Sequence, residues 1–459
     1  MTSSERRYNL TEGSILQKIL LVALPIIGSQ FMQMTYNLTD MFWLGRLSSD
    51  AVAASGTAGF YLWLSQAFLI IARMGAEIGV AQHIGRGDRK EAEKYCQNAL
   101  LIAVSAGILY GVSLLVFRTP LIGFFAIQEA DVAADAASYL SIIAIGIPMS
   151  FTTAAVTGTF NASGNSRIPF YINATGLVVN MVLDPLFIFG MNGGIQGAAA
   201  ATVIGQSVVC LLSLAALLFH RERPFEKFRL SLSPDRRTIM QILRWCIPIG
   251  IESMLFTLLS MVIARFVSGW GSSAIAAQRI GSQIESLSWL LGASLASALT
   301  AFTGQNFGAQ KWPRIREGYR ITVVISFVWG CIVSFVMFFL GGALYRVFVS
   351  EPDVILFGIQ YMRILALCQI AGNLENVAAG AFRGMGKTLP PTIVSVSCNA
   401  LRILLCCLLS RTALGLDGIW IGLTLGAVLR GFGIFIWYAI FSRRHRRDPH
   451  FENHANFLG

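Results

Sequence analysis

Charged side chains are scarce in this sequence. They make up 13% of the 459 residues, whereas hydrophobic residues make up 55%. Soluble proteins normally carry about 25% charged residues. The composition therefore excludes a water-soluble globular protein and predicts an all-α polytopic membrane protein.

Residues with catalytic or metal-binding chemistry are also few. The eight cysteines lie in or at the ends of apolar stretches without metal-ligand spacing, which is typical of buried thiols. No phosphate-binding P-loop is present, so an ion gradient or an unseen partner must supply energy. We therefore expect no enzyme and no cofactor. The five histidines lie at predicted cytoplasmic ends or in the tail: His83, His220, His445, His450 and His454.

Apolar stretches long enough to cross a bilayer, which takes about 20 residues, occur twelve times. The first six predicted spans are 15–45, 51–82, 95–117, 137–160, 168–190 and 194–219. The other six are 239–268, 274–304, 318–346, 357–381, 389–412 and 418–441.

The basic residues are distributed unevenly between the two sides of these spans. Of the 35, four fall in the predicted outer connections, six within spans and 25 on the inner side. The positive-inside rule then predicts an inner-membrane protein with both termini in the cytoplasm. Because the basic residues lie in short runs between apolar segments, they indicate topology and not a nucleic-acid partner.

The second half of the sequence repeats the first. At an offset of 223, shifting to 222, the aligned pairs include Pro25 with Pro248, Gln82 with Gln305, Gly85 with Gly308, Tyr139 with Tyr361 and Gly158 with Gly380. An offset of six spans keeps both copies in the same orientation, so the repeats are parallel. We expect two six-helix lobes, 1–220 and 239–442, joined by a cytoplasmic linker 221–238 and followed by a tail 443–459. A cleft between such lobes is the natural place for a substrate.

Four polar residues of the first lobe form the main candidate site. Asp40, Asp184 and Thr202 each lie six to eight residues from an outer span end, about 9 to 12 Å below the surface. Asn180 shares a helix face with Asp184 at i, i+4. Pro185 frees a backbone carbonyl. Intramembrane carboxylates are costly and mark functional sites, so this set suits a proton or a cation such as Na+. The alternative is that these groups only hydrogen-bond the helices together.

The second lobe carries acids of its own. Glu252, Glu285 and Glu375 are candidates for a second cation or substrate site. The alternative is that half or more of the charges there are structural. Arg402 is a plausible ion-pair partner of Glu375. In the repeat, Arg402 stands opposite Asn180, while Ile263 and Cys406 match Asp40 and Asp184.

The sequence resembles the multidrug and toxic compound extrusion (MATE) family of antiporters. The motifs that carry the resemblance are LPIIGSQFMQMTYNLTDMFWLGRLSSDAVAA, NMVLDPLFIFG followed by GGIQGAAAAT, and GAFRGMGKTLPP. The resemblance implies export of organic, often cationic, compounds in exchange for Na+ or H+. It assigns the first-lobe cation site to Asp40, Asn180, Asp184 and Thr202, and the seventh-helix acid to Glu252. Glu375 is displaced from the family's tenth-helix acid.

The expected partners are small organic substrates and the lipid bilayer, with no obligate protein partner. Tyr36, Asn37 and Asn173 are candidates for lining the substrate cavity. A major facilitator transporter is a poorer match, because its loop motif fails at Glu91 in HIGRGDRKEAEK. A flippase or exporter of lipid-linked oligosaccharides or metabolites, from the same superfamily, remains the alternative.

Overall fold

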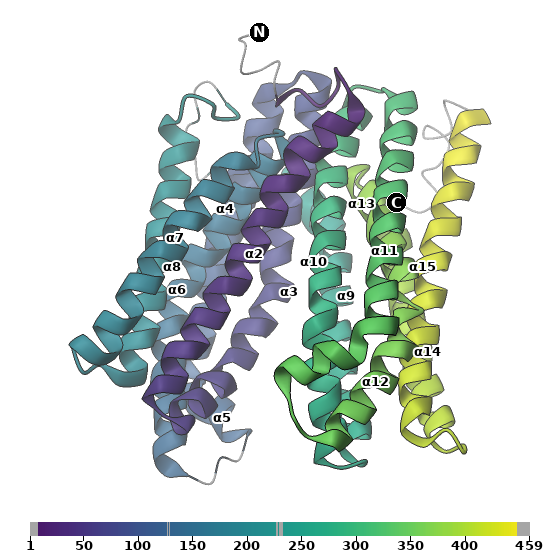
Figure 1. Ribbon diagram of the computed structural model, residues 1–459. Coiled ribbons are helices and arrows are strands. Elements are labelled where there is room, and N and C mark those ends of the chain that lie inside the picture. Colours follow the sequence, from purple (N-terminus) through teal and green to yellow (C-terminus); the bar gives the residue numbers. More distant parts are fainter. Residues whose placement is uncertain (1–7, 126, 128, 226–227, 229–232, 448–459) are drawn as a thin grey trace. The chain divides into compact units, whose positions relative to one another are not determined.

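The computed structural model describes residues 8–125, 127, 129–225, 228 and 233–447, and every regular element there is a helix (Figure 1). The first half contains α2 (Ile15–Leu47), α3 (Ser49–Arg86), α4 (Arg89–Val116), α5 (Arg118–Gly123), α6 (Ala130–Ala162), α7 (Arg167–Pro185), the π-helix η1 (Leu186–Gly190) and α8 (Gly194–Phe219). The second half contains α9 (Arg236–Ser268), α10 (Ser272–Gly308), α11 (Trp312–Phe348), α12 (Pro352–Ala366), α13 (Gln369–Gly384), α14 (Leu389–Ser410) and α15 (Gly415–Arg447).

Eleven stretches of the described chain are long and apolar enough to cross a membrane as single helices. The pair α12 and α13, bent by 48° at a short break, gives a twelfth when counted as one span. The all-helical, twelve-span fold predicted from hydropathy is thus confirmed. The break at Leu367 and Cys368 within the tenth span was not foreseen.

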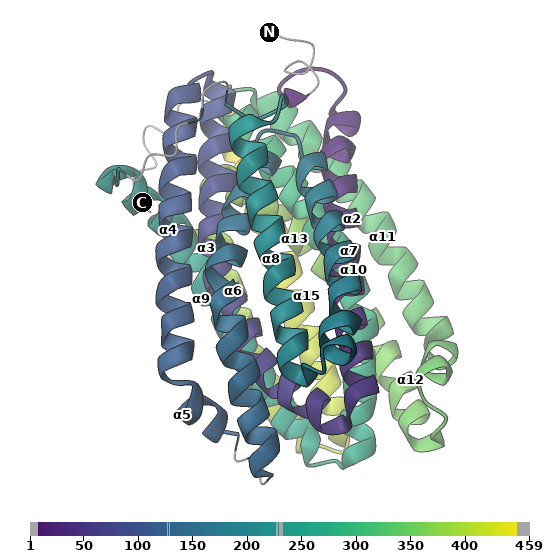
Figure 2. The ribbon, with the colours of Figure 1, turned by 90° about the vertical axis from the view of Figure 1, so that its left-hand side faces the viewer.

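The chain divides into two compact units. Unit 1 is Met1–Ile251 with Gly304–Gln310, and unit 2 is Glu252–Thr303 with Lys311–Gly459. Within unit 1, α6 packs against α3, α4 and α8, while α7 lies beside α2 and α8 (Figure 2). Within unit 2, α11 packs against α12 and α13, and α15 packs against α12, α13 and α14. The pairs α4–α6, α6–α8 and α7–α8 of unit 1 therefore correspond to α11–α13, α13–α15 and α14–α15 of unit 2.

The repeated glycines explain part of this matching. A Cβ on Gly158 of α6 would lie 2.4 Å from the carbonyl oxygen of Arg73 on α3. A Cβ on Gly380 of α13 would lie 2.6 Å from the carbonyl oxygen of Ala296 on α10. Arg73 and Ala296 are themselves 223 positions apart. Each copy therefore needs glycine there so that two helix backbones can touch.

A second pair of aligned glycines makes a reciprocal contact inside unit 1. A Cβ on Gly85 would lie 1.9 Å from the carbonyl oxygen of Gln305, and a Cβ on Gly308 would lie 1.9 Å from that of Gln82. All four residues belong to unit 1, because the end of α10 packs there. Neither glycine position has room for a side chain.

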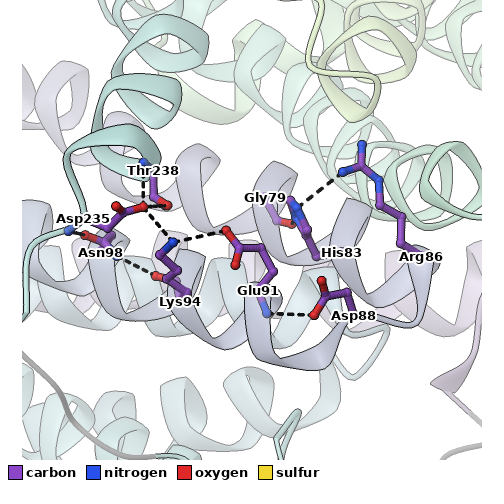
Figure 3. Close-up of polar contacts among 9 residues, drawn as sticks. All are labelled: Gly79, His83, Arg86, Asp88, Glu91, Lys94, Asn98, Asp235 and Thr238. Carbon is purple, nitrogen blue, oxygen red and sulfur yellow. Dashed lines mark hydrogen bonds and ion pairs between the residues drawn. The ribbon is translucent and has the colours of Figure 1, made fainter.

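The start of α9 is held by a polar cluster around Asp235 (Figure 3). Asp235 accepts hydrogen bonds from the hydroxyl and backbone N–H of Thr238, and pairs with Lys94 of α4 at 2.9 Å. Its own backbone N–H donates to Asn98 at 2.9 Å. The Thr238 hydroxyl, Lys94 and the Thr238 N–H, in that order, lower the pKa of Asp235 to about 2. This carboxylate both caps α9 and ties it to α4.

Candidate functional site

Asn180 and Asp184 lie together on α7, as their spacing predicts. Both side chains are fully buried, and the Asn180 amide donates a 2.9 Å hydrogen bond to Oδ1 of Asp184. Oδ2 of Asp184 and the amide oxygen of Asn180 have no hydrogen-bond donor among the described residues. Two buried oxygens are thus left for a ligand, since a buried acceptor without a donor costs free energy.

Asp40 and Tyr36 share one face of α2 at i, i+4 spacing. Oδ1 of Asp40 is buried and lacks a donor in the described chain. Asp40 and Asp184 are near enough to interact electrostatically, and both act on the Tyr36 hydroxyl, which lies beside Thr202. Two like charges in this surrounding repel each other strongly, because the low dielectric screens them little.

Thr202 reaches the cluster because α8 is built from small residues where it meets η1 and α7. A Cβ on Gly197 would lie 2.5 Å from the carbonyl oxygen of Phe187 in η1. Further along α8, Gly205 faces Asn180, with the nearest atom 3.6 Å from its Cβ position. The GGIQGAAAAT motif thus lets α8 approach these backbones closely.

The π-helix follows directly from Pro185. Proline has no N–H, so the regular hydrogen-bond ladder is interrupted there. The next turn closes through the wider bond from Met191 N–H to the Leu186 carbonyl, at 2.9 Å. Such turns are frequent at functional sites. The interruption lies immediately after Asp184.

The sequence did not identify two further members of this neighbourhood. Tyr139 of α6 is buried and interacts electrostatically with Asp40, Asp184 and Tyr36. The feature of the sequence that could have identified Tyr139 is its alignment with Tyr361 in the repeat. Gln206, one turn after Thr202 on α8, has a buried amide oxygen without a donor in the described chain.

The other two proposed cavity residues are less integrated. Asn37 is exposed and accepts a 3.4 Å hydrogen bond from Gln33 on its own helix. Asn173 is half-buried on α7, about two turns before Asn180. Neither forms a hydrogen bond with the two carboxylates in the described structure.

The three candidate acids of unit 2 have different partners, although Glu252 and Glu375 are near enough to interact electrostatically. Glu285 of α10 is buried and accepts hydrogen bonds from Gln369 at 2.9 Å and from the Tyr361 hydroxyl at 3.3 Å. Glu252 of α9 lies 3.8 Å from Arg383. The acids thus differ in kind, since Glu285 has neutral partners and Glu252 has a cationic one.

The predicted pairing of Glu375 with Arg402 is wrong. Glu375 of α13 instead accepts a 2.7 Å hydrogen bond from Nε of Arg430 on α15. The Ser395 hydroxyl is 3.5 Å from its other oxygen. Arg430 reaches Glu375 because α13 packs against α15 more extensively than against α14. Glu375 therefore has a cationic partner in the described chain, as Glu252 does.

Chemically, the unit 1 cluster offers two carboxylates, an amide oxygen and hydroxyl groups. These are hard oxygen donors, which suit a proton or a hard cation such as Na+. Within the described ranges, no group of three or more His, Cys, Asp or Glu residues is placed to hold a metal ion.

The internal repeat is also seen when the chain is compared with known protein families. The MatE family model matches the chain twice, over residues 25–186 and 248–408. The two matches begin 223 positions apart and end 222 apart, the register seen in the sequence.

Two relatives that align over most of this chain are named as probable multidrug resistance proteins. The chain is 29% identical over 423 residues to a probable multidrug resistance protein NorM of Thermotoga maritima, covering 91% of this chain and 90% of that protein. It is 25% identical to the probable multidrug resistance protein YoeA of Bacillus subtilis, covering 93% and 95%.

Solved structures share the fold. A crystal structure of MATE in the bent conformation superposes with a TM-score of 0.90 at 20% identity, covering 97% of this chain and 99% of that one. An outward-facing multidrug resistance MATE family transporter gives 0.89 at 20% identity, covering 97% and 99%. The repeat, the family model and the relatives together define a polytopic membrane transporter and not an enzyme. The chain belongs to the MatE family, the multidrug and toxic compound extrusion transporters.

Proposed function

We propose that this transporter exports organic compounds, chiefly cationic or amphipathic ones, in exchange for Na+ or H+. The observation that carries the proposal is the pair Asp40 and Asp184 among apolar helices of unit 1, each with an oxygen that lacks a donor in the described chain. The multidrug resistance names of its relatives support export of drug-like compounds.

The coupling step follows from charge. With both carboxylates ionised, their repulsion opposes close packing of α2 and α7. A bound Na+ would neutralise this repulsion and take Asn180 and Thr202 as neutral oxygen ligands. A proton would neutralise it by converting one carboxylate into a hydrogen-bond donor. Either ion therefore favours a more compact site than the empty one.

The two helices that carry the acids each contain a proline, which lowers the cost of bending them. Pro25 lies within α2, and Pro185 ends α7. Since each proline removes a helical hydrogen bond, bending there breaks fewer bonds than elsewhere. We infer that ion entry from outside reshapes α2 and α7, releases substrate outward, and permits the return of the empty carrier.

The energy available is adequate for export. A monovalent cation that crosses 100 mV releases about 2.3 kcal/mol. This supports a substrate gradient of about fifty-fold when one net charge moves. The gradient is smaller when the substrate is itself a cation.

The decisive experiment measures gradient-driven efflux in proteoliposomes. Asp184→Asn should abolish ion-coupled efflux of a fluorescent organic cation without loss of membrane insertion. Asp131→Asn, the same change at an exposed acid on α6, should have no effect. Unchanged efflux by the Asp184 variant would contradict the assignment. Comparing efflux driven by a Na+ gradient with efflux driven by a pH gradient in the same vesicles identifies the coupling ion.

The substrate class needs its own measurement. Overexpression should raise resistance to several unrelated organic cations. Translocation of a lipid-linked oligosaccharide in the same vesicles, without drug efflux, would favour the flippase function instead.

A further inference from the structure

Arg402 on α14 is a buried cation without an acidic partner. Only 8% of its surface is exposed, and no carboxylate of the described chain lies within ion-pair distance. Its Nε is buried without a hydrogen-bond acceptor. Arg430 in the same unit differs, because it bonds Glu375 and lies 3.5 Å from the Asn399 side-chain oxygen.

Such a residue is costly, so its retention requires a reason. A charged side chain within a membrane span costs several kcal/mol unless it is paired, and these residues mark substrate or ion pathways. A buried charge that is left without a compensating partner is destabilising. Arg402 has neither a carboxylate partner nor an exposed face.

Three helices position this guanidinium. A Cβ on Gly426 of α15 would lie 2.7 to 3.1 Å from the Cβ, Cγ and Cδ of Arg402, so the arginine stem runs flat over a glycine. Its Cζ lies 5.4 Å from the ring centroid of Phe256 on α9. This cation–π contact stabilises the charge but leaves the edge of the guanidinium, with its N–H donors, free. The local packing thus holds the side chain in place without using its hydrogen bonds.

Glu285 does not supply the missing partner. It feels the charge of Arg402 electrostatically, yet its two oxygens accept from Gln369 and Tyr361. Unit 2 therefore holds an acid and a base near each other that are not bonded to each other.

The repeat gives an independent observation. Arg402 stands 222 positions after Asn180, and Cys406 stands 222 after Asp184, in the register of the two family matches. Where unit 1 presents an amide and a carboxylate, unit 2 presents a guanidinium and a thiol. At the matched positions a neutral amide is replaced by a cation and a carboxylate by a thiol, a change of charge that favours an anion in unit 2.

We propose that Arg402 binds the carboxylate group of amphoteric organic substrates, compounds that carry a cationic centre, an aromatic body and a carboxylate. The planar guanidinium presents two parallel N–H groups that match a carboxylate. The Phe256 ring offers an apolar surface beside it for the aromatic body. The proposal deepens the proposed export function and rests on it.

The test compares a rhodamine that bears a free benzoate with its methyl ester, which keeps the cationic dye and lacks the carboxylate. Fluorescence anisotropy measures the affinity of each dye for the purified full-length protein. Arg402→Gln should weaken binding of the free acid by about tenfold or more relative to the ester, since a charge-assisted hydrogen bond is lost. Arg402→Lys should recover part of the affinity, because lysine keeps the positive charge but lacks the two parallel N–H groups of the guanidinium.

The matched control is Arg411→Gln, which removes an exposed positive charge just beyond the end of the same helix. It should leave the ratio of acid to ester affinity unchanged. An equal loss for both dyes in Arg402→Gln would overturn the proposal, as would equal binding of the free acid by wild type and variant. If Arg402→Gln fails to give a monodisperse protein, Arg402→Lys alone decides, with a preferential loss of acid binding expected.

Efflux of the two dyes separates this inference from the proposed function. If wild-type vesicles export neither dye under any ion gradient, the export function fails while the binding measurement still judges Arg402. If wild type exports the ester and the acid, and the Arg402→Gln variant loses both equally, the export function stands and the carboxylate site is refuted.

Discussion

Glu375 on α13 accepts a 2.7 Å hydrogen bond from Nε of Arg430 on α15, and this pair lies largely out of solvent. The side chains retain 11% and 18% exposure respectively, so little water screens the charges. A partly buried ion pair is sensitive to loss of one member, because the other charge is then left without compensation.

We therefore expect Glu375→Gln to lower the free energy of unfolding by about 3 kcal/mol or more. The double variant Glu375→Gln with Arg430→Gln should lose less than the sum of the single changes, since no charge is left alone. Thermal unfolding of the detergent-solubilised protein, followed by intrinsic fluorescence, measures both. Additive losses would show that the two residues act independently.

The close approach of α8 to η1 predicts a contrast between two glycines of one helix. Gly197→Ala would put a methyl group 2.5 Å from the Phe187 carbonyl oxygen, whereas Gly205→Ala would meet its nearest neighbour at 3.6 Å. We expect Gly197→Ala to destabilise by about 1 to 3 kcal/mol and Gly205→Ala to be tolerated. The same unfolding assay compares them. Equal stability of both variants would contradict this close approach of α8 to η1.

The Asp235 cluster predicts a pH dependence. Its pKa in the folded protein, about 2, lies below the usual value for aspartate because Thr238 and Lys94 favour the charged form. A depressed pKa contributes stability above the unfolded value, and this contribution is lost as pH falls from about 4 to about 2. Asp235→Asn should therefore reduce the loss of stability as the pH falls from about 4 to about 2, which unfolding measured at a series of pH values tests. An unchanged loss of stability over this range would exclude this role.

The reciprocal contact in unit 1 predicts that either glycine is intolerant of substitution. Gly308→Ala would place a methyl group on the Gln82 carbonyl, and Gly85→Ala would place one on the Gln305 carbonyl. The helices must separate in both cases, because backbone atoms cannot rotate away. We expect each variant to reduce the yield of folded protein and its unfolding temperature. Gly87→Ala is unsuitable as a control, since its φ of +80° is itself strained in alanine; Gly56→Ala, with nothing near its Cβ, is suitable.

The number of spans and the repeat could be predicted because hydropathy and spacing are properties of the chain itself. The break between α12 and α13 could not. In the first copy Gly107 of α4 lies against Pro148, yet α6 continues through that proline. In the second copy Gly330 of α11 lies against Ile370, which follows a break that no proline marks. A search for helix breakers would have placed the break in the wrong copy.

At the site, sequence reasoning worked where one helix sets the geometry. Asn180 and Asp184 meet because residues four apart share a face. Depth below the surface could also be counted, since each residue rises by a fixed amount. Rotation of one helix against another cannot be counted this way. This is why Tyr139 was missed, and why Arg430 and not Arg402 was found beside Glu375.

The reciprocal contact of Gly85 and Gly308 is of the kind that identical chains make about a two-fold axis, where residue i meets j and j meets i. In a homodimer of half-length chains, one glycine would serve both contacts, and a single substitution would damage two at once. A fused chain encodes the two contacts separately. That freedom extends to the polar residues: Asn180 and Arg402 hold matched positions with different chemistry, an asymmetry that two identical subunits could never have acquired.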